Sequence, residues 1–146
     1  IKGKQTATTF HKKLGKIMWD YCGMSRNEEG LNKALKMVNE LEEEFWNDLI
    51  VPGTGESLNM ELEKAGRVAD YFELARLMIN DALDRKESCG AHFREESQTP
   101  EGEAERDDKN YQYVAVWEYT GKGSAPKLHK EDLVFEEVEV KVRSYK

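Results

Sequence analysis

The chain has 146 residues, 38% of them hydrophobic and 35% charged, and its formal net charge is −7. This length fits one domain, and it allows a core without disulfides because roughly 68–70% of the unfolded surface can be buried. The acidic balance argues against a nucleic-acid platform, which normally carries a broad basic stripe, and no apolar run approaches the ~20 residues that span a bilayer.

The charge is unevenly distributed along the chain. Residues 1–26 carry six cations and one acid, a net of +5 that leaves −12 for residues 27–146. We interpret the basic segment as a solvated helix face, with docking onto an acidic neighbour as the alternative. Cys22 and Cys89 lie far apart in sequence, which favours free thiols in a reducing compartment over a disulfide scaffold.

Two amphipathic helices are predicted before residue 50. The first begins at Thr8 or Thr9, both good N-caps, and runs to about Tyr21 with apolar residues along one stripe. The second covers about residues 28–49 after a turn at 25–27. Its predicted buried face consists of Leu31, Ala34, Leu35, Val38, Leu41, Phe45 and Leu49.

A third helix follows the breaker at residues 52–55. Ser57 or Asn59 can cap it, and it runs to about Asp84. Its predicted buried stripe consists of Leu62, Ala65, Val68, Ala69, Phe72, Ala75, Leu77, Ile79 and Ala82. Residues 74–79 are apolar nearly all round, which predicts that this helix is the central one. Three long helices with short links predict an antiparallel three-helix bundle over residues 1–94.

The pattern changes after residue 94. Residues 95–110 are acidic and contain Pro100, which predicts a long exposed loop whose carboxylates are solvated. Residues 111–119 and 133–142 alternate apolar and polar side chains, as strands do, and residues 121–124 form a turn. A two-stranded hairpin is marginal alone. We therefore expect residues 95–146 to form an extension with a small antiparallel hairpin or meander, packed on the bundle as one mainly α domain.

The densest group of reactive side chains is the run from Arg85 to Arg94, at the predicted end of the third helix. Cys89 and His92 have the C-x-x-H spacing that can start a zinc site, but structural zinc needs four ligands and the chain has no second clustered pair. The same two residues could form a nucleophilic pair. The sequence shows no group that would orient His92 for that role.

We interpret this run instead as a rigid polar corner. Arg85 and Arg94 are expected to pair with carboxylates, and Gly90 is expected to allow a turn. Ser88 and His92 can bond to loop backbone. A helix C-terminus also favours nearby cations.

The same run, Arg85-Lys86-Glu87-Ser88-Cys89-Gly90-Ala91-His92-Phe93-Arg94, resembles the R-K-E-S-R-G-A-H-x-R motif of succinate dehydrogenase and fumarate reductase flavoprotein subunits. L-aspartate oxidase carries a related version. Residues 105–110 resemble the family's E-R-D-D-x-N, and Gly23, Arg26 and Leu31 follow a first helix as they do in the family. One departure is Cys89, which stands where the family has an arginine with five donors.

The resemblance implies that this chain, which begins at Ile1, is the C-terminal helical domain of a longer subunit. The intact subunit would interconvert succinate and fumarate with FAD and exchange electrons with quinone through iron–sulfur clusters in a partner subunit. Its own flavin-binding and capping domains would lie upstream. We therefore expect no catalytic, cofactor-binding or metal-binding residue in this chain, and the isolated chain should be inactive.

The resemblance also implies partners and a location. The domain would pack against its own flavin-binding and capping domains and the iron–sulfur subunit, and would meet a membrane anchor only indirectly, without nucleic acid. The subunit would be cytoplasmic and peripheral on the inner face of the cytoplasmic membrane. The expected structural and interdomain motif consists of Arg85, Glu87, Ser88, Cys89, Gly90, His92, Arg94, Arg106 and Asp107. Two alternatives stay open: a free-standing helical interaction module, and the C-terminal domain of L-aspartate oxidase.

Overall fold

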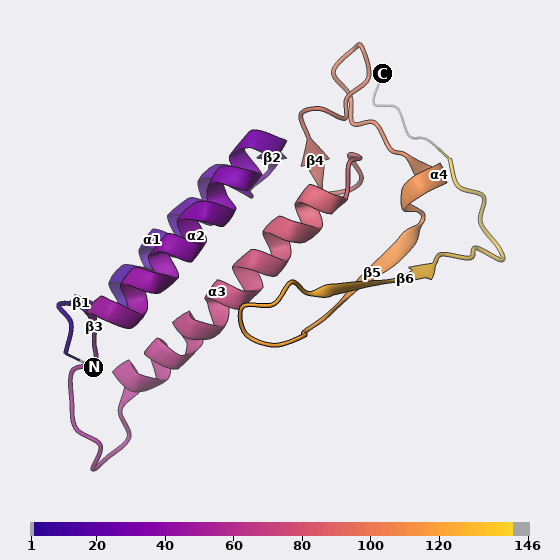
Figure 1. Ribbon diagram of the computed structural model, residues 1–146. Helices are drawn as coiled ribbons and strands as arrows, with labels where there is room; N and C mark the ends of the chain where they lie inside the picture. The colour runs from indigo at the N-terminus through magenta and orange to yellow at the C-terminus, as the bar shows by residue number, and fades with distance from the viewer. Residues whose placement is uncertain (1, 142–146) are drawn as a thin grey trace.

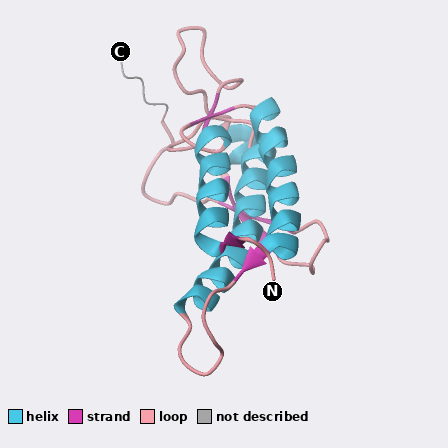
Figure 2. Cartoon of the chain, turned by 90° about the vertical axis from the view of Figure 1, so that its left-hand side faces the viewer, coloured by secondary structure: helices cyan, strands magenta, loops and turns pink. Residues whose placement is uncertain are grey.

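The computed structural model describes residues 2–141. Three helices, α1 (Ala7–Tyr21), α2 (Glu28–Asp48) and α3 (Met60–Asp84), lie side by side in Figures 1 and 2. Short links reverse the chain between them, so α2 runs opposite to α1 and α3. The predicted antiparallel three-helix bundle is confirmed. No helix in the described range is long and apolar enough to cross a membrane.

Each of the three helices begins at a side chain that accepts a hydrogen bond from its first turn. Asn27 caps α2, and Asn59, one of the two predicted caps, begins α3. The cap of α1 is Thr6, so the prediction of Thr8 or Thr9 was wrong. Thr6 has the extended backbone that a cap requires, whereas Thr9 already lies in the helix and donates its backbone N–H to Thr6.

The core lies between the helices and is built around three phenylalanines. Phe10, Phe45 and Phe72 come from α1, α2 and α3 and are fully buried. The ring centroids of Phe10 and Phe45 are 5.3 Å apart, and those of Phe45 and Phe72 are 5.4 Å apart. Such aromatic pairs contribute about 0.5–1.5 kcal/mol beyond their buried area. One residue from each helix therefore fixes the centre of the bundle.

Helix α3 buries one face only, so the prediction that it is the central helix was wrong. Ala75 and Ile79 are buried, but Leu74 and Met78 each leave 53% of their surface exposed. Leu62, which was predicted in the buried stripe, is also 53% exposed. The reason is geometric, because α1 and α2 pack against the face of α3 that carries Ala75 and Ile79, and Leu74 and Met78 lie outside this contact.

Two short parallel strand pairs join the ends of the helices. β1 (Gln5–Thr6) pairs with β3 (Leu49–Ile50), which ties the start of α1 to the end of α2. β2 (Ser25–Arg26) pairs with β4 (Phe93–Arg94), which ties the α1–α2 link to the segment after α3. The sequence does not predict either pair, because two residues are too few for a recognisable alternation.

The extension contains the predicted hairpin with a different second strand. β5 (Tyr113–Glu118) pairs antiparallel with β6 (Lys127–Asp132), where Glu118 faces Lys127 and Tyr113 faces Asp132. The prediction of a second strand over 133–142 was wrong for 133–141, which have no regular structure, and residue 142 lies outside the described residues. The turn after β5 ends at Pro126, so Lys127 already pairs with Glu118. The second strand therefore forms before the predicted valine-rich segment, which starts near Val134. A short helix, α4 (Asp108–Tyr111), begins inside the predicted loop.

Candidate functional site: the polar corner at the end of helix α3

The run from Arg85 to Arg94 folds back over the C-terminal end of α3, and we call it the polar corner. The side chain of Arg94 is 2% exposed. Its Nη1 donates to the carbonyl oxygen of Ala82 at 2.7 Å, and its Nε donates to Glu96 Oε2 at 3.0 Å. The last carbonyls of a helix lack partners within it, and the helix dipole favours a cation there. Arg94 therefore closes the end of α3.

Ser88 joins the two ends of the polar corner and attaches it to the acidic loop. It is fully buried. Its Oγ accepts from the backbone N–H of Arg94 at 2.8 Å and donates to the carbonyl of Arg94 at 3.1 Å. The backbone N–H of Ser88 donates to the carbonyl of Glu105 at 2.8 Å. One serine thus supports β4 and holds the acidic loop.

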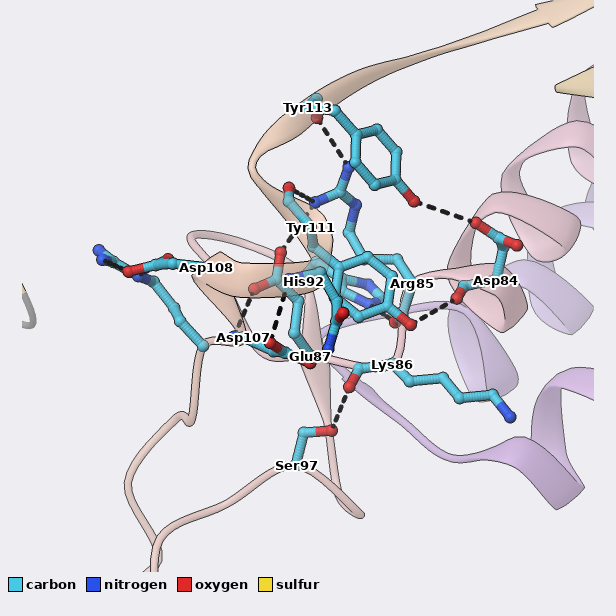
Figure 3. Close-up of polar contacts among 12 residues, drawn as sticks. Asp84, Arg85, Lys86, Glu87, His92, Ser97, Asp107, Asp108, Tyr111 and Tyr113 are labelled. Carbon is cyan, nitrogen blue, oxygen red and sulfur yellow. Dashed lines mark hydrogen bonds and ion pairs between the residues drawn. The ribbon is translucent and has the colours of Figure 1, made fainter. Parts of the chain in front are cut away.

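Arg85 and Glu87 join α3 to the start of β5 (Figure 3). Nη1 of Arg85 donates to Glu87 Oε1 at 2.8 Å and to the carbonyl of Tyr111 at 3.0 Å, and Nη2 donates to the carbonyl of Tyr113 at 3.1 Å. The guanidinium also lies 5.0 Å from the ring centroid of Tyr113. Glu87 is 3% exposed, and its second oxygen accepts from the backbone N–H of Asp107 at 2.9 Å. Both oxygens of the buried Glu87 carboxylate are therefore hydrogen-bonded, as its desolvation requires.

Arg106 and Asp107 lie at the outer side of the same corner. Asp107 caps α4, because its carboxylate accepts from the backbone N–H of Asn110 at 3.2 Å and from the side-chain amide at 2.7 Å. Arg106 forms a two-pronged pair with Asp108, at 2.9 and 2.6 Å. These hydrogen bonds raise the pKa of Arg106. Its remaining nitrogen donates to the carbonyl of Lys141 at 3.2 Å.

His92 lies among three arginines, and its partners define its protonation state. Nδ1 is 2.9 Å from Nη1 of Arg26, and Nε2 is 2.8 Å from the carbonyl oxygen of Arg85. A guanidinium can only donate and a carbonyl can only accept, so Nδ1 accepts and Nε2 carries the proton. Burial lowers the pKa of His92, and the charges of Arg26, Arg94 and Arg85 lower it further against the opposing bond to the carbonyl. His92 is therefore neutral.

Cys89 and Gly90 form the tip of a tight turn. The backbones of Cys89 and His92 exchange hydrogen bonds of 2.8 and 3.1 Å, and Gly90 has a φ of +60°, which favours glycine. The thiol of Cys89 is exposed. Because Arg26 and Arg85 occupy both ring nitrogens of His92, the imidazole is not available as a base for this thiol. Within residues 2–141, no group of three or more His, Cys, Asp or Glu side chains could hold a metal ion.

The α1–α2 link contacts the polar corner and the neighbouring Glu95, and these contacts were not predicted. Ser25 Oγ and Asn27 Nδ2 donate to the two oxygens of Glu95 at 2.7 and 2.8 Å. The bonds from Asn27 and Ser25 lower the pKa of Glu95. Arg26 lies beside Arg94 in the β2–β4 pair and bonds to His92. The one sequence signal for this contact was Arg26 in the family's Gly–Arg–Leu pattern.

FAD, which the resemblance implies for the intact subunit, has no fitting site in the described residues. A cavity of about 870 Å³ lies between α2, α3 and the turn that follows β5. Its lining includes Glu42 and Glu73, both paired with Arg76, and further carboxylates at Glu28 and Asp84. A dinucleotide pyrophosphate needs a glycine-rich turn at the N-terminus of a helix. The lining also includes Lys86 and Lys122, but its glycine-containing turn, at Gly123, joins β5 to β6 and does not begin a helix.

Comparison with known proteins agrees with the resemblance. Residues 11–145 match the family model described as fumarate reductase flavoprotein C-term. The chain is 30% identical to the fumarate reductase flavoprotein subunit of Proteus vulgaris over 132 residues, which are 90% of this chain and 21% of that protein. It is 38% identical to a chloroplastic L-aspartate oxidase of Nicotiana tabacum over 82 residues, which are 56% of this chain and 12% of that protein.

The fold agrees as well. A solved structure of quinol–fumarate reductase with menaquinol molecules superposes with a TM-score of 0.76 at 25% identity, over 94% of this chain and 23% of that chain. The chain therefore spans only about a fifth of the fumarate reductase subunits that it matches. It belongs to the family of fumarate reductase flavoprotein C-terminal domains.

Proposed function

We propose that this chain is the C-terminal helical domain of a succinate dehydrogenase or fumarate reductase flavoprotein subunit, and that it serves packing and not catalysis. The polar corner carries this proposal. Glu87, Ser88 and Arg94 are buried, and each is bonded to partners within the chain. Within the described residues, no buried side-chain nitrogen or oxygen lacks a partner. A general acid or base must reach the reacting proton of its substrate, and these three side chains are buried within the chain.

In the intact subunit, the upstream flavin-binding and capping domains would hold FAD, which accepts a hydride as succinate becomes fumarate. Electrons would then pass through iron–sulfur clusters of a partner subunit to quinone, or run in the reverse direction. The subunit would be attached peripherally to the inner face of the cytoplasmic membrane through its partner subunits. The residues of this chain take no part in these steps and keep the domain rigid beside them.

The polar corner supplies that rigidity by fixing the extension to the bundle. Arg85 bonds to the carbonyls of Tyr111 and Tyr113, and Glu87 bonds to the backbone of Asp107. These contacts support the proposal that the bundle, residues 1–94, and the extension, residues 95–146, form one domain. As an interdomain motif these residues would act by positioning the domain, because Glu87, Ser88 and Arg94 are buried within this chain.

The isolated chain and the full-length subunit together test this function. The isolated chain should be colourless and should not reduce a dye with succinate. The full-length subunit should carry flavin and should reduce the dye when succinate is added. A yellow, flavin-containing preparation of the isolated chain would contradict the proposal. A parent gene that starts immediately before Ile1 would instead favour a free-standing interaction module.

The same dye assay separates the proposal from L-aspartate oxidase. The Proteus vulgaris subunit matches 90% of this chain, whereas the tobacco oxidase matches 56%. We therefore expect the full-length subunit to oxidise succinate in preference to L-aspartate and to co-purify with an iron–sulfur subunit. Preferential oxidation of L-aspartate by a subunit that purifies alone would reverse the assignment.

A further inference from the structure

Residues 25–28, in the α1–α2 link, and residues 92–96, after α3, meet where β2 pairs with β4 (Figure 1). Besides the backbone pairing, four hydrogen bonds to side-chain acceptors join these two segments, which both lie in the described part of the chain. Each acceptor belongs to an ionisable group. The acceptors are Nδ1 of His92, both carboxylate oxygens of Glu95, and Oε1 of Glu96. The attachment of the α1–α2 link therefore depends on which of these groups carry a proton.

His92 holds the link only in its neutral form. Its Nδ1 accepts from Nη1 of Arg26 at 2.9 Å, whereas both nitrogens of a protonated imidazole donate. A proton on Nδ1 would thus remove the acceptor and bring two cations into contact. The charges that act on the ring come from Arg26 in β2, Arg94 in β4 and Arg85 at the end of α3, and all three are positive. The thiol of Cys89, on the same turn as His92, is exposed.

Glu95 and Glu96 hold the link as carboxylates, because hydrogen bonds to an ionised acceptor are roughly twice as strong as those to a neutral one. Glu96 accepts from the backbone N–H of Glu28 at 2.5 Å and from Nε of Arg94 at 3.0 Å. Burial raises the pKa of Glu96, and these two bonds lower it by more. The other charged groups here are Glu28 and Glu29, in the first turn of α2. Acid therefore weakens these contacts as well, at a lower pH than the contact of His92.

The opposite end of the bundle is held by carboxylates. There β1 pairs with β3, and Nε2 of Gln5 donates to Glu44 at 2.6 Å and to Asp48 at 2.8 Å. Carboxyl groups of an unfolded chain titrate near pH 4, and histidine titrates near pH 6.5. Of the two strand pairs, therefore, only β2–β4 depends on a group that titrates between about pH 7 and 5.

We propose that residues 25–28 and 92–96 form an acid-sensitive latch, which releases the α1–α2 link from the polar corner when His92 takes up a proton. The helices stay packed, because the buried core cluster of the described residues contains no Asp, Glu, Lys, Arg or His. Each opening takes up at most one proton at His92, so the opening constant rises at most tenfold per pH unit below about 6.5. This inference does not rest on the proposed function.

Hydrogen exchange of the full-length polypeptide, measured by mass spectrometry of its peptides at pH 7, 6 and 5, tests the latch. Each exchange rate is divided by the intrinsic amide rate at the same pH. Protection of the peptides that contain residues 25–28 and 92–96 should fall several-fold, and by at most about 30-fold, from pH 7 to pH 5. The reason is that a paired segment exchanges only when it opens. Peptides that contain β1 and β3 are the matched control and should keep their protection.

Two variants identify the group that responds. His92→Gln removes the titration and keeps an amide that can accept from Arg26 and donate to the carbonyl of Arg85, so its protection should not change between pH 7 and 5. Glu95→Gln leaves His92 in place and should keep the pH dependence. Constant protection in the natural polypeptide would overturn the proposal, and so would a loss shared by the β1 and β3 peptides, because the whole bundle would then be unfolding. An unchanged pH dependence in His92→Gln would also overturn it, and the profile of the natural polypeptide decides alone if that variant does not fold.

Discussion

The polar corner and the α1–α3 groove, a shallow apolar groove whose lining includes Leu74 and Met78, reverse the usual places of polar and apolar side chains. Arg94 and Glu87 are almost completely buried, whereas Leu74 and Met78 are half exposed. A buried charge is tolerated only when it is paired and hydrogen-bonded, and the polar corner meets this condition from its own chain. Nothing in residues 2–141 covers the groove. The domain therefore supplies the hydrogen-bond partners of its own buried charges, but it does not cover the apolar side chains of this groove.

The largest effect is expected where the polar corner is deepest. Arg94→Met should lower the free energy of unfolding by about 3 kcal/mol, because the carbonyl of Ala82 loses its donor and the guanidinium volume is only partly refilled. Urea denaturation measures this loss. The control is Arg67→Met, since Arg67 pairs with Glu63 at the surface and its removal should cost little beside that of Arg94. Equal losses for both variants would show that the polar corner is an ordinary surface.

Glu87→Gln should cost less, about 2 kcal/mol. The substitution keeps the shape but removes the charge beside Arg85, and it can turn an amide N–H toward the backbone N–H of Asp107. Glu43, an exposed residue of α2, provides the matched control as Glu43→Gln. If both variants unfold at the same urea concentration, the Arg85–Glu87 pair does not hold the extension.

A smaller effect should depend on pH, because folding lowers the pKa of His92. As the pH falls below about 6.5, the ordinary pKa of histidine, His92 is protonated in the unfolded chain but stays neutral in the folded chain. The free energy of unfolding should therefore fall toward acid, by at most about 1.4 kcal/mol per pH unit. The stability advantage of the natural chain over His92→Gln should shrink between about pH 7 and 5. An advantage that stays constant or grows would refute the neutral assignment.

The smallest effect is expected in the groove of the isolated chain. Leu74→Ala should lower the free energy of unfolding by less than about 1 kcal/mol, whereas the fully buried Ile79→Ala should lower it by about 3 kcal/mol. Both residues lie on α3, and the helix propensities of Leu, Ile and Ala differ by less than about 0.7 kcal/mol, which is too little to produce this contrast. A similar loss for the two variants would place Leu74 in the core and remove the contrast with the polar corner.

The sequence predicted the helices well because their signals are local. Apolar residues at helical spacing mark the helices, and Asn59, one of the two predicted caps, begins α3. Asn27, which caps α2, was predicted only as part of the turn at 25–27. The second strand of the hairpin was missed for the opposite reason. Residues 127–132 are mostly charged, and they form β6 because β5 lies beside them. Strand formation depends on such neighbours more than on composition.

The polar corner could be located but not assembled from the sequence. The density of charged side chains identified the run from Arg85 to Arg94. Its partners include the carbonyls of Ala82, Tyr111 and Tyr113, and backbone acceptors leave no trace in a sequence. The β2–β4 pair places Arg26 beside Arg94. Its strands have only two residues each, so the sequence shows no alternation that would predict them.

The two strand pairs have a consequence for the order of folding. β1–β3 closes a loop over residues 5–50, and β2–β4 closes one over residues 25–94, so the two loops overlap along the chain. Each closure costs chain entropy that only a few hydrogen bonds repay, whereas contacts within a helix are local and fast. We expect the helices to dock first and both ends of the bundle to close after the rate-limiting step. Substitutions at Ser25 and Gln5 should then speed unfolding and leave refolding unchanged, and slower refolding would show that the ends close early.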